Sequence, residues 1–62
     1  MSINHYIKDL DTGLFLDTYG PSMEEMDWTD SKTTAFKMDR EAAITRLRIV
    51  GKYFPRATIV EG

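Results

Sequence analysis

The triplet Asp11-Thr12-Gly13 has the residue types that carry the catalytic carboxylate in aspartic-protease chemistry. That chemistry needs two carboxylates that share one proton, so a chain with one triplet would have to form a symmetric dimer. A chain of 62 residues is also short for building a substrate cleft. We therefore interpret the triplet as a turn, in which Gly13 adopts a positive φ and the Asp and Thr side chains bond to nearby backbone amides.

Asp9 and Asp11 also occupy the spacing of the first and third ligands of a calcium-binding loop. Such a loop takes further oxygen ligands from its fifth position and from a bidentate Glu at its twelfth position. Here those two positions hold Gly13 and Gly20, which have no side-chain oxygen. The sequence therefore predicts no calcium site.

The other residues with catalytic or metal-binding chemistry stand alone. His5 is the only histidine, and the chain has no cysteine to join it in a zinc site. Within a strand pattern, we interpret His5 as a partly buried structural residue. Ser22 and Ser31 lack the context of a nucleophile elbow, and no glycine-rich phosphate loop is present. We expect a non-enzymatic protein with no metal and no cofactor.

Size and composition indicate a single domain over residues 1–62 with one thin core, because a domain this small buries only about 60% of the surface of its unfolded chain. No apolar run approaches the length of about 20 residues that a membrane span needs, and the first ten residues lack the pattern of a signal peptide. We expect a soluble, cytoplasmic protein without a membrane partner.

Hydrophobic periodicity predicts the elements that must position any site. Alternation over residues 3–7 and 14–16 predicts two strands of a hairpin, and residues 33–38 and 56–61 predict two more strands. Asp39 is a good N-cap for a helix that begins at residue 40 and ends near Gly51. The predicted fold class is α+β, with a small antiparallel sheet, one helix packed on one of its faces, and the order β-β-β-α-β.

The predicted helix has two apolar strips. One consists of Ala43, Ile44, Leu47 and Val50, which we expect to cover the sheet. The other consists of Ala42, Ile49 and Tyr53, and it lies on the opposite side if the helix persists that far. This second strip predicts a homodimer. The alternative is that the helix ends near Val50 and that Tyr53 packs beneath the last strand.

Residues 20–31 have no clear periodicity and are predicted to form a loop. This segment combines acidic residues with large or adaptable apolar ones, a composition that suits the recognition of a basic protein surface. The predicted partner-binding residues are Met23, Glu24, Glu25, Met26, Asp27, Trp28 and Asp30. For Trp28 the alternative is a place in the core as a lid over the small sheet.

Charge is divided unevenly along the chain, whose net charge is −2. Residues 1–30 hold seven acidic residues and one lysine, whereas residues 31–62 hold seven basic residues and three acidic ones. A nucleic-acid site would use basic residues of the helix and the following turn, namely Arg46, Arg48, Lys52 and Arg56. Because these residues lie on different sides of the predicted helix, we favour an ordinary solvated helix surface over a nucleic-acid partner.

Trp28-Thr29, Ala35, Phe36 and Ala42, preceded by YIKDLDTGLFL, form a pattern that resembles small uncharacterised proteins encoded by phages and mobile elements. In those proteins a two-stranded start precedes a Trp-Thr segment and an Ala-bearing helix. The resemblance implies an inhibitor or modulator that occupies a surface of a host protein, such as a defence nuclease, in the manner of an anti-CRISPR protein, or a transcription factor. The alternatives are a nucleic-acid-binding accessory protein and a self-assembling structural protein.

Overall fold

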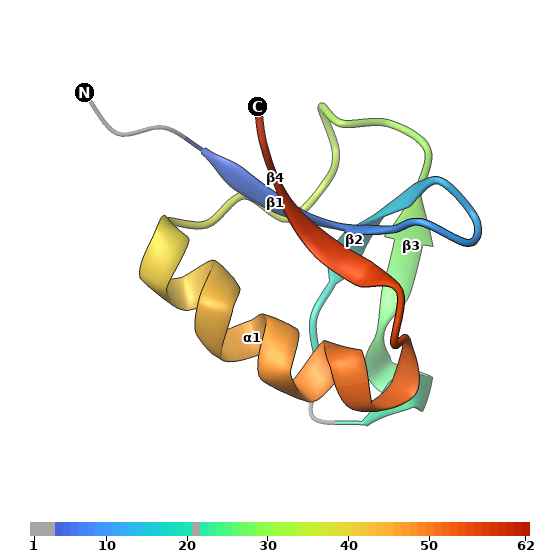
Figure 1. Ribbon diagram of the computed structural model, residues 1–62. Coiled ribbons are helices and arrows are strands. Elements are labelled where there is room, and N and C mark those ends of the chain that lie inside the picture. Colours follow the sequence, from blue (N-terminus) through green and yellow to red (C-terminus); the bar gives the residue numbers. More distant parts are fainter. Residues whose placement is uncertain (1–3, 21) are drawn as a thin grey trace.

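The protein is a four-stranded antiparallel sheet with one helix packed on one of its faces (Figure 1). The computed structural model describes residues 4–20 and 22–62. Its strands are β1 (His5–Asp9), β2 (Leu14–Thr18), β3 (Asp27–Thr29) and β4 (Ala57–Glu61), and its helices are a short 3₁₀ helix η1 (Met23–Glu25) and an α-helix α1 (Arg40–Tyr53). The spatial order of the strands is β3-β2-β1-β4. The predicted α+β class and the order β-β-β-α-β are confirmed.

The core lies between the sheet and α1, which packs against β1 and β4. Ile7 of the central strand β1 and Leu16 of β2 are completely buried, as are Ala43 and Val50 of α1. Because side chains alternate along a strand, Ile59 of β4, which pairs with Ile7, also faces this core. The predicted alternation therefore places Ile7, Leu16 and Ile59 toward the core, but β1 is not half-exposed as the pattern predicts, because Tyr6 on its other face is only 5% exposed.

The third strand is not where the sequence pattern predicts it. Residues 33–38 form a turn and an isolated bridge, while the strand lies at Asp27–Thr29 and pairs with β2. Thr34 serves local bonds instead, because its N–H and its Oγ1 each donate to Ser31 O at 3.2 Å, and Lys37 Nζ donates to Thr33 O at 2.8 Å. Hydroxyl side chains and turns of this kind compete with strand formation.

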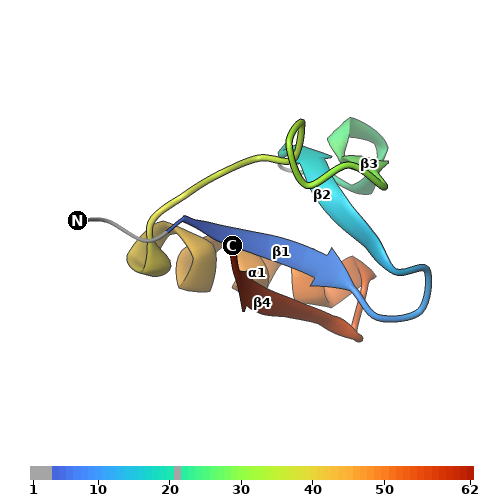
Figure 2. The ribbon, with the colours of Figure 1, turned by 90° about the horizontal axis from the view of Figure 1, so that it is seen from above.

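The end of this misassigned segment nevertheless enters the sheet. β1 and β2 pair near their shared turn and then diverge, as Figure 2 shows. Met38 exchanges two backbone hydrogen bonds with His5, of 2.9 and 3.1 Å, and Phe36 N donates to Leu16 O at 2.8 Å. Residues 36–38 thus form hydrogen bonds with backbone groups of both diverging strands. The segment has a strand-like sequence and bonds to the sheet, but it does not form a regular strand.

Asp39 caps α1 as predicted, because its Oδ1 accepts a hydrogen bond of 2.8 Å from Ala42 N. The helix continues through Gly51 to Tyr53, and Phe54 N donates to Val50 O at its end. The prediction that Gly51 terminates the helix is wrong. Pro55 follows directly and prevents a further turn. In the described part of the chain, no helix has both the length and the apolar character required to span a bilayer.

Candidate partner-binding surface

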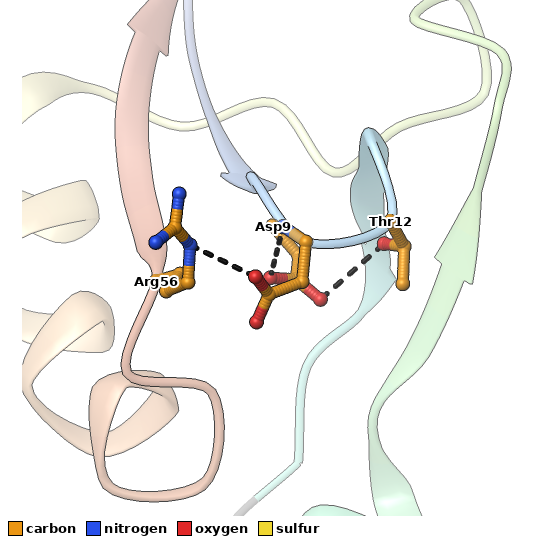
Figure 3. Close-up of polar contacts among 4 residues, drawn as sticks. Asp9, Thr12 and Arg56 are labelled. Atoms are coloured by element: carbon orange, nitrogen blue, oxygen red, sulfur yellow. Dashed lines mark hydrogen bonds and ion pairs between the residues drawn. The ribbon is translucent and has the colours of Figure 1, made fainter.

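The Asp-Thr-Gly triplet forms the turn between β1 and β2 (Figure 3). Gly13 has a φ of +75°, and its N–H donates to Asp9 O at 2.7 Å. The carboxylate of Asp9 accepts hydrogen bonds from Asp11 N at 3.2 Å and from Thr12 Oγ1 at 3.3 Å. The turn, the positive φ of Gly13 and the hydrogen bond that Thr12 Oγ1 accepts from a backbone amide, Leu14 N, are confirmed, whereas the carboxylate that bonds to the backbone is that of Asp9, which is only 5% exposed, and not that of Asp11.

The carboxylate of Asp11 pairs instead with Arg56, whose Nε lies 2.8 Å from Asp11 Oδ1; Figure 3 labels Arg56 beside the turn. No group of three or more His, Cys, Asp or Glu side chains within the described residues is arranged to hold a metal ion. The carboxylates of this turn therefore serve the turn itself and its link to the start of β4.

The acidic segment, which we define as residues 22–30, is an ordered element and not the predicted loop. It consists of η1 followed by β3, which forms one edge of the sheet. Of the predicted partner-binding residues, five are exposed: Met23, Glu24, Glu25, Asp27 and Asp30. Met23 has 51% of its surface exposed.

The other two predicted partner-binding residues hold this segment to the core. Met26 is only 6% exposed and belongs to the buried cluster, so its prediction as a surface residue is wrong. Trp28 pairs with Leu16, is half-buried, and packs edge-on against Phe54 with the ring centroids 4.8 Å apart. Trp28 is therefore part of the packing at the C-terminal end of α1, as the core alternative predicted.

The four carboxylates of the acidic segment have no basic neighbour at ion-pair distance within the described residues. The ion pair found there joins Asp11 to Arg56, and a 3.9 Å contact joins Glu61 to His5, which carries charge only when protonated; both lie outside the segment. Exposed like charges repel one another across a surface unless counter-charges face them. Among the described residues, η1, β3 and Asp30 thus present exposed carboxylates that have no ion-pair partner.

The basic residues that the sequence analysis considered for nucleic acid do not form one patch. Arg46 lies between two aromatic rings, with its Cζ 5.0 Å from the centroid of Tyr19 and 4.9 Å from that of Phe36. Arg56 is paired with Asp11, whereas Arg48 and Lys52 are exposed one turn apart on α1. Arg46 acts as a packing residue between α1 and the segments next to β2, a role that the sequence pattern gave no reason to expect.

The second apolar strip of α1 is also distributed differently from the prediction. Ala42 and Ile49 are half-buried and pack against the core, whereas Tyr53 is 43% exposed. Conversely, Ile44, predicted to face the core, is 39% exposed. The buried face of α1 is therefore rotated relative to the predicted one, and of the predicted homodimer residues only Tyr53 is largely exposed, whereas Ala42 and Ile49 are partly exposed.

An open hollow with a volume of about 460 Å³ lies where the N-terminal half of α1 meets the chain after β2. It is lined by Tyr19, Asp39, Glu41, Ala42, Thr45 and Arg46. Asp39 is occupied by its capping bond, and Thr45 Oγ1 donates to Glu41 O at 3.0 Å. Sequence reasoning could not find this hollow, because Tyr19 is brought to it only by the path of the chain beyond β2.

Comparisons with protein-family models, with curated proteins and with solved structures found no match to this chain or its fold.

Proposed function

We propose that this protein is a non-enzymatic binding module that recognises a basic surface of a partner protein through its acidic segment. The observation that carries the proposal is that Glu24, Glu25, Asp27 and Asp30 are all exposed and have no ion-pair partner among the described residues. Retaining uncompensated like charges side by side costs stability, and a basic partner offsets that cost when it binds.

Within the acidic segment, some residues pack on the core and others are exposed for contact with a partner. Met26 and Trp28 fix it to the core, while Met23 and the carboxylates are left for contact. A surface that is already ordered loses little conformational entropy on binding, and the negative charge accelerates encounter with a positive partner. Met23, which is exposed next to Glu24 in the sequence, supplies an adaptable apolar contact.

The setting we propose is that of a phage-type or mobile-element-encoded inhibitor or modulator of a host protein, acting in the host cytoplasm by covering a basic surface. This part of the proposal is supported by the sequence resemblance of residues 6–50. A defence nuclease or a transcription factor is the class of target that fits it, because proteins that bind nucleic acid present basic grooves to which an acidic protein surface is complementary.

The test compares two variants of equal charge. The segment variant carries Glu24→Gln, Glu25→Gln and Asp27→Asn, and the control carries Asp11→Asn, Glu41→Gln and Glu61→Gln, which are exposed acids of other surfaces. Tagged wild-type protein and both variants are used to capture partners from nuclease-treated lysate, and association rates with the captured partner are measured at two salt concentrations. The segment variant should associate at least about tenfold more slowly, with a weaker salt dependence.

The control variant should bind as the wild type does, because it changes the net charge equally but leaves the segment intact. Equal losses in both variants would mean that net charge alone matters and would contradict the proposed site. Loss of every partner on nuclease treatment would instead favour the nucleic-acid alternative. Melting curves of both variants show whether either substitution set acts through the fold.

A further inference from the structure

β4 forms the second edge of the sheet, and Figure 2 shows no segment of the described chain beyond it. Its sequence, ATIVE, contains no proline, and it pairs with β1 without interruption over all five residues. Edge strands are usually protected by proline, lysine, a bulge or a covering segment, because their free backbone groups are a template for another strand. β4 itself contains no proline, lysine or bulge, and among the described residues the side-chain bond to its outer edge is that of Lys32 Nζ to Glu61 O.

The hydrogen-bond pattern determines which backbone groups of β4 are free. Leu10 N donates to Arg56 O and Gly62 N donates to Asn4 O, so the even-numbered residues of β4 bond to β1. Because bonding alternates along an antiparallel strand, the N–H and C=O groups of Ala57, Ile59 and Glu61 point away from β1. Two of these six groups are already used: Ala57 N donates to Phe54 O at 2.9 Å, and Glu61 O accepts from Lys32 Nζ at 3.3 Å.

We propose that two copies of this chain pair through β4, with the strands antiparallel and related by a two-fold axis at Ile59. In this register Ile59 N bonds to Ile59 O of the second copy, and Glu61 N bonds to Ala57 O of the second copy, each twice by symmetry. The groups satisfied are the ones that the single chain leaves free. Ala57 N and Glu61 O already have hydrogen bonds within the single chain. In the dimer, Ala57 N of one copy faces Glu61 O of the other, and the pairing does not need a bond between them.

The side chains fit the same register. Thr58 lies opposite Val60 of the second copy, and such cross-strand β-branched pairs stabilise a sheet. Glu61, the only charged residue of β4, lies opposite Ala57. The two Glu61 side chains are then separated by four residues along the ribbon, about 13 Å, so no like charges oppose one another.

The helices are compatible with this pairing. α1 packs on β1 and β4, so the axes of the two α1 helices would lie about two strand spacings apart, or roughly 10 Å, which is a normal distance for packed helices. Arg46 faces Tyr19 on the β2 side of α1, and Ile44 lies about 160° around the helix from it, on the β4 side. The exposed Ile44 would therefore be covered in the dimer.

Sedimentation velocity of the wild type from about 10 μM to about 1 mM should show a monomer–dimer equilibrium. Amide hydrogen exchange over the same range should show Ile59 and Glu61 gaining at least about tenfold protection as dimer forms. Thr58 and Val60 should be protected at every concentration, because they bond to β1. A monomer throughout, or a dimer in which the Ile59 and Glu61 amides exchange as in the monomer, overturns the proposal, and this readout needs no variant.

Glu61→Pro and Glu61→Ala form a matched pair of variants. Both remove a side chain that is 71% exposed, but only proline removes the outward N–H and places a ring against the second copy. Glu61→Pro should weaken dimerisation by at least about tenfold, and Glu61→Ala should dimerise like the wild type. A Glu61→Pro variant that keeps Thr58 and Val60 protected yet still dimerises normally would contradict the proposal, as would equal weakening by both substitutions.

Discussion

Arg56 Nε and Asp11 Oδ1 lie 2.8 Å apart and join the turn before β4 to the turn between β1 and β2. Backbone bonding supports the same junction, since Leu10 N donates to Arg56 O at 3.3 Å. Both side chains of the ion pair are more than half exposed, with 64% and 59% of their surface accessible, so water and salt screen their attraction. The conformation of Gly13 is the stronger constraint on the turn.

Substitutions in this turn should separate the two contributions. Gly13→Val should lower the free energy of unfolding by about 1–2 kcal/mol, because a β-branched residue is strained at a φ of +75°. An added Cβ meets no neighbour within 4 Å, so the cost is one of backbone conformation and not of crowding. Gly13→Asn should cost clearly less, since asparagine tolerates this region. Denaturant titrations of the two variants provide the measurement.

Asp11→Asn is the control for the same turn. It should change stability by no more than about 0.5 kcal/mol, because it removes one exposed ion pair and leaves the Asp9 network in place. A peptidase activity of the purified protein that disappears in Asp11→Asn would show that the turn interpretation omits a catalytic role.

Features governed by neighbouring residues could be predicted from the sequence. The Asp-Thr-Gly turn, the cap at Asp39 and the strand after Pro55 each depend on residues within a few positions of one another. Features that depend on competition between distant segments could not. Residues 33–38 have strand-forming side chains, but Met38 reaches only an isolated bridge because β1 and β2 diverge around it.

The end of the helix is a second case in which distant packing prevails over a local rule. Glycine is a poor helix former, yet α1 continues past Gly51 because Phe54, beyond its last turn, packs on Trp28. The contact between Trp28 and Phe54 also shows why the partner-binding residues were predicted only in part, because it joins residues that are far apart in the sequence. Met26 and Trp28 are as apolar as Met23, and nothing in the sequence reveals which of the three faces the core.

The rotation of the buried face of α1 leads to a prediction with two matched substitutions. Ile49→Glu should destabilise the fold by about 2–3 kcal/mol, because it places a carboxylate against the core cluster. Ile44→Glu should cost less than about 1 kcal/mol, since Ile44 is 39% exposed. Thermal melts at low micromolar concentration, where self-association is weakest, give the comparison. If Ile44→Glu destabilised the fold more than Ile49→Glu, the buried face of α1 would be the one that the sequence pattern predicts.

Trp28 is the residue for which packing and recognition are hardest to separate, and its side chain offers a direct test. Its ring packs edge-on against Phe54, while its Nε1 is buried without a hydrogen-bond acceptor among the described residues. Trp28→Phe keeps an aromatic contact and removes the unpaired N–H, so stability should stay within about 1 kcal/mol of the wild type. Trp28→Ala should lose about 2–4 kcal/mol, because the half-buried ring is removed from the core.

Circular dichroism is the appropriate measurement for both variants, since Trp28 is the only tryptophan and its fluorescence is lost in each. In the wild type, that fluorescence should be shielded from a soluble quencher and become accessible on unfolding. A Trp28→Ala variant as stable as the wild type would mean that the ring contributes little to the fold. The exposed part of the Trp28 ring would then be available for contact with a partner. Trp28 would in that case belong to the partner-binding residues of the acidic segment, as the sequence analysis predicts.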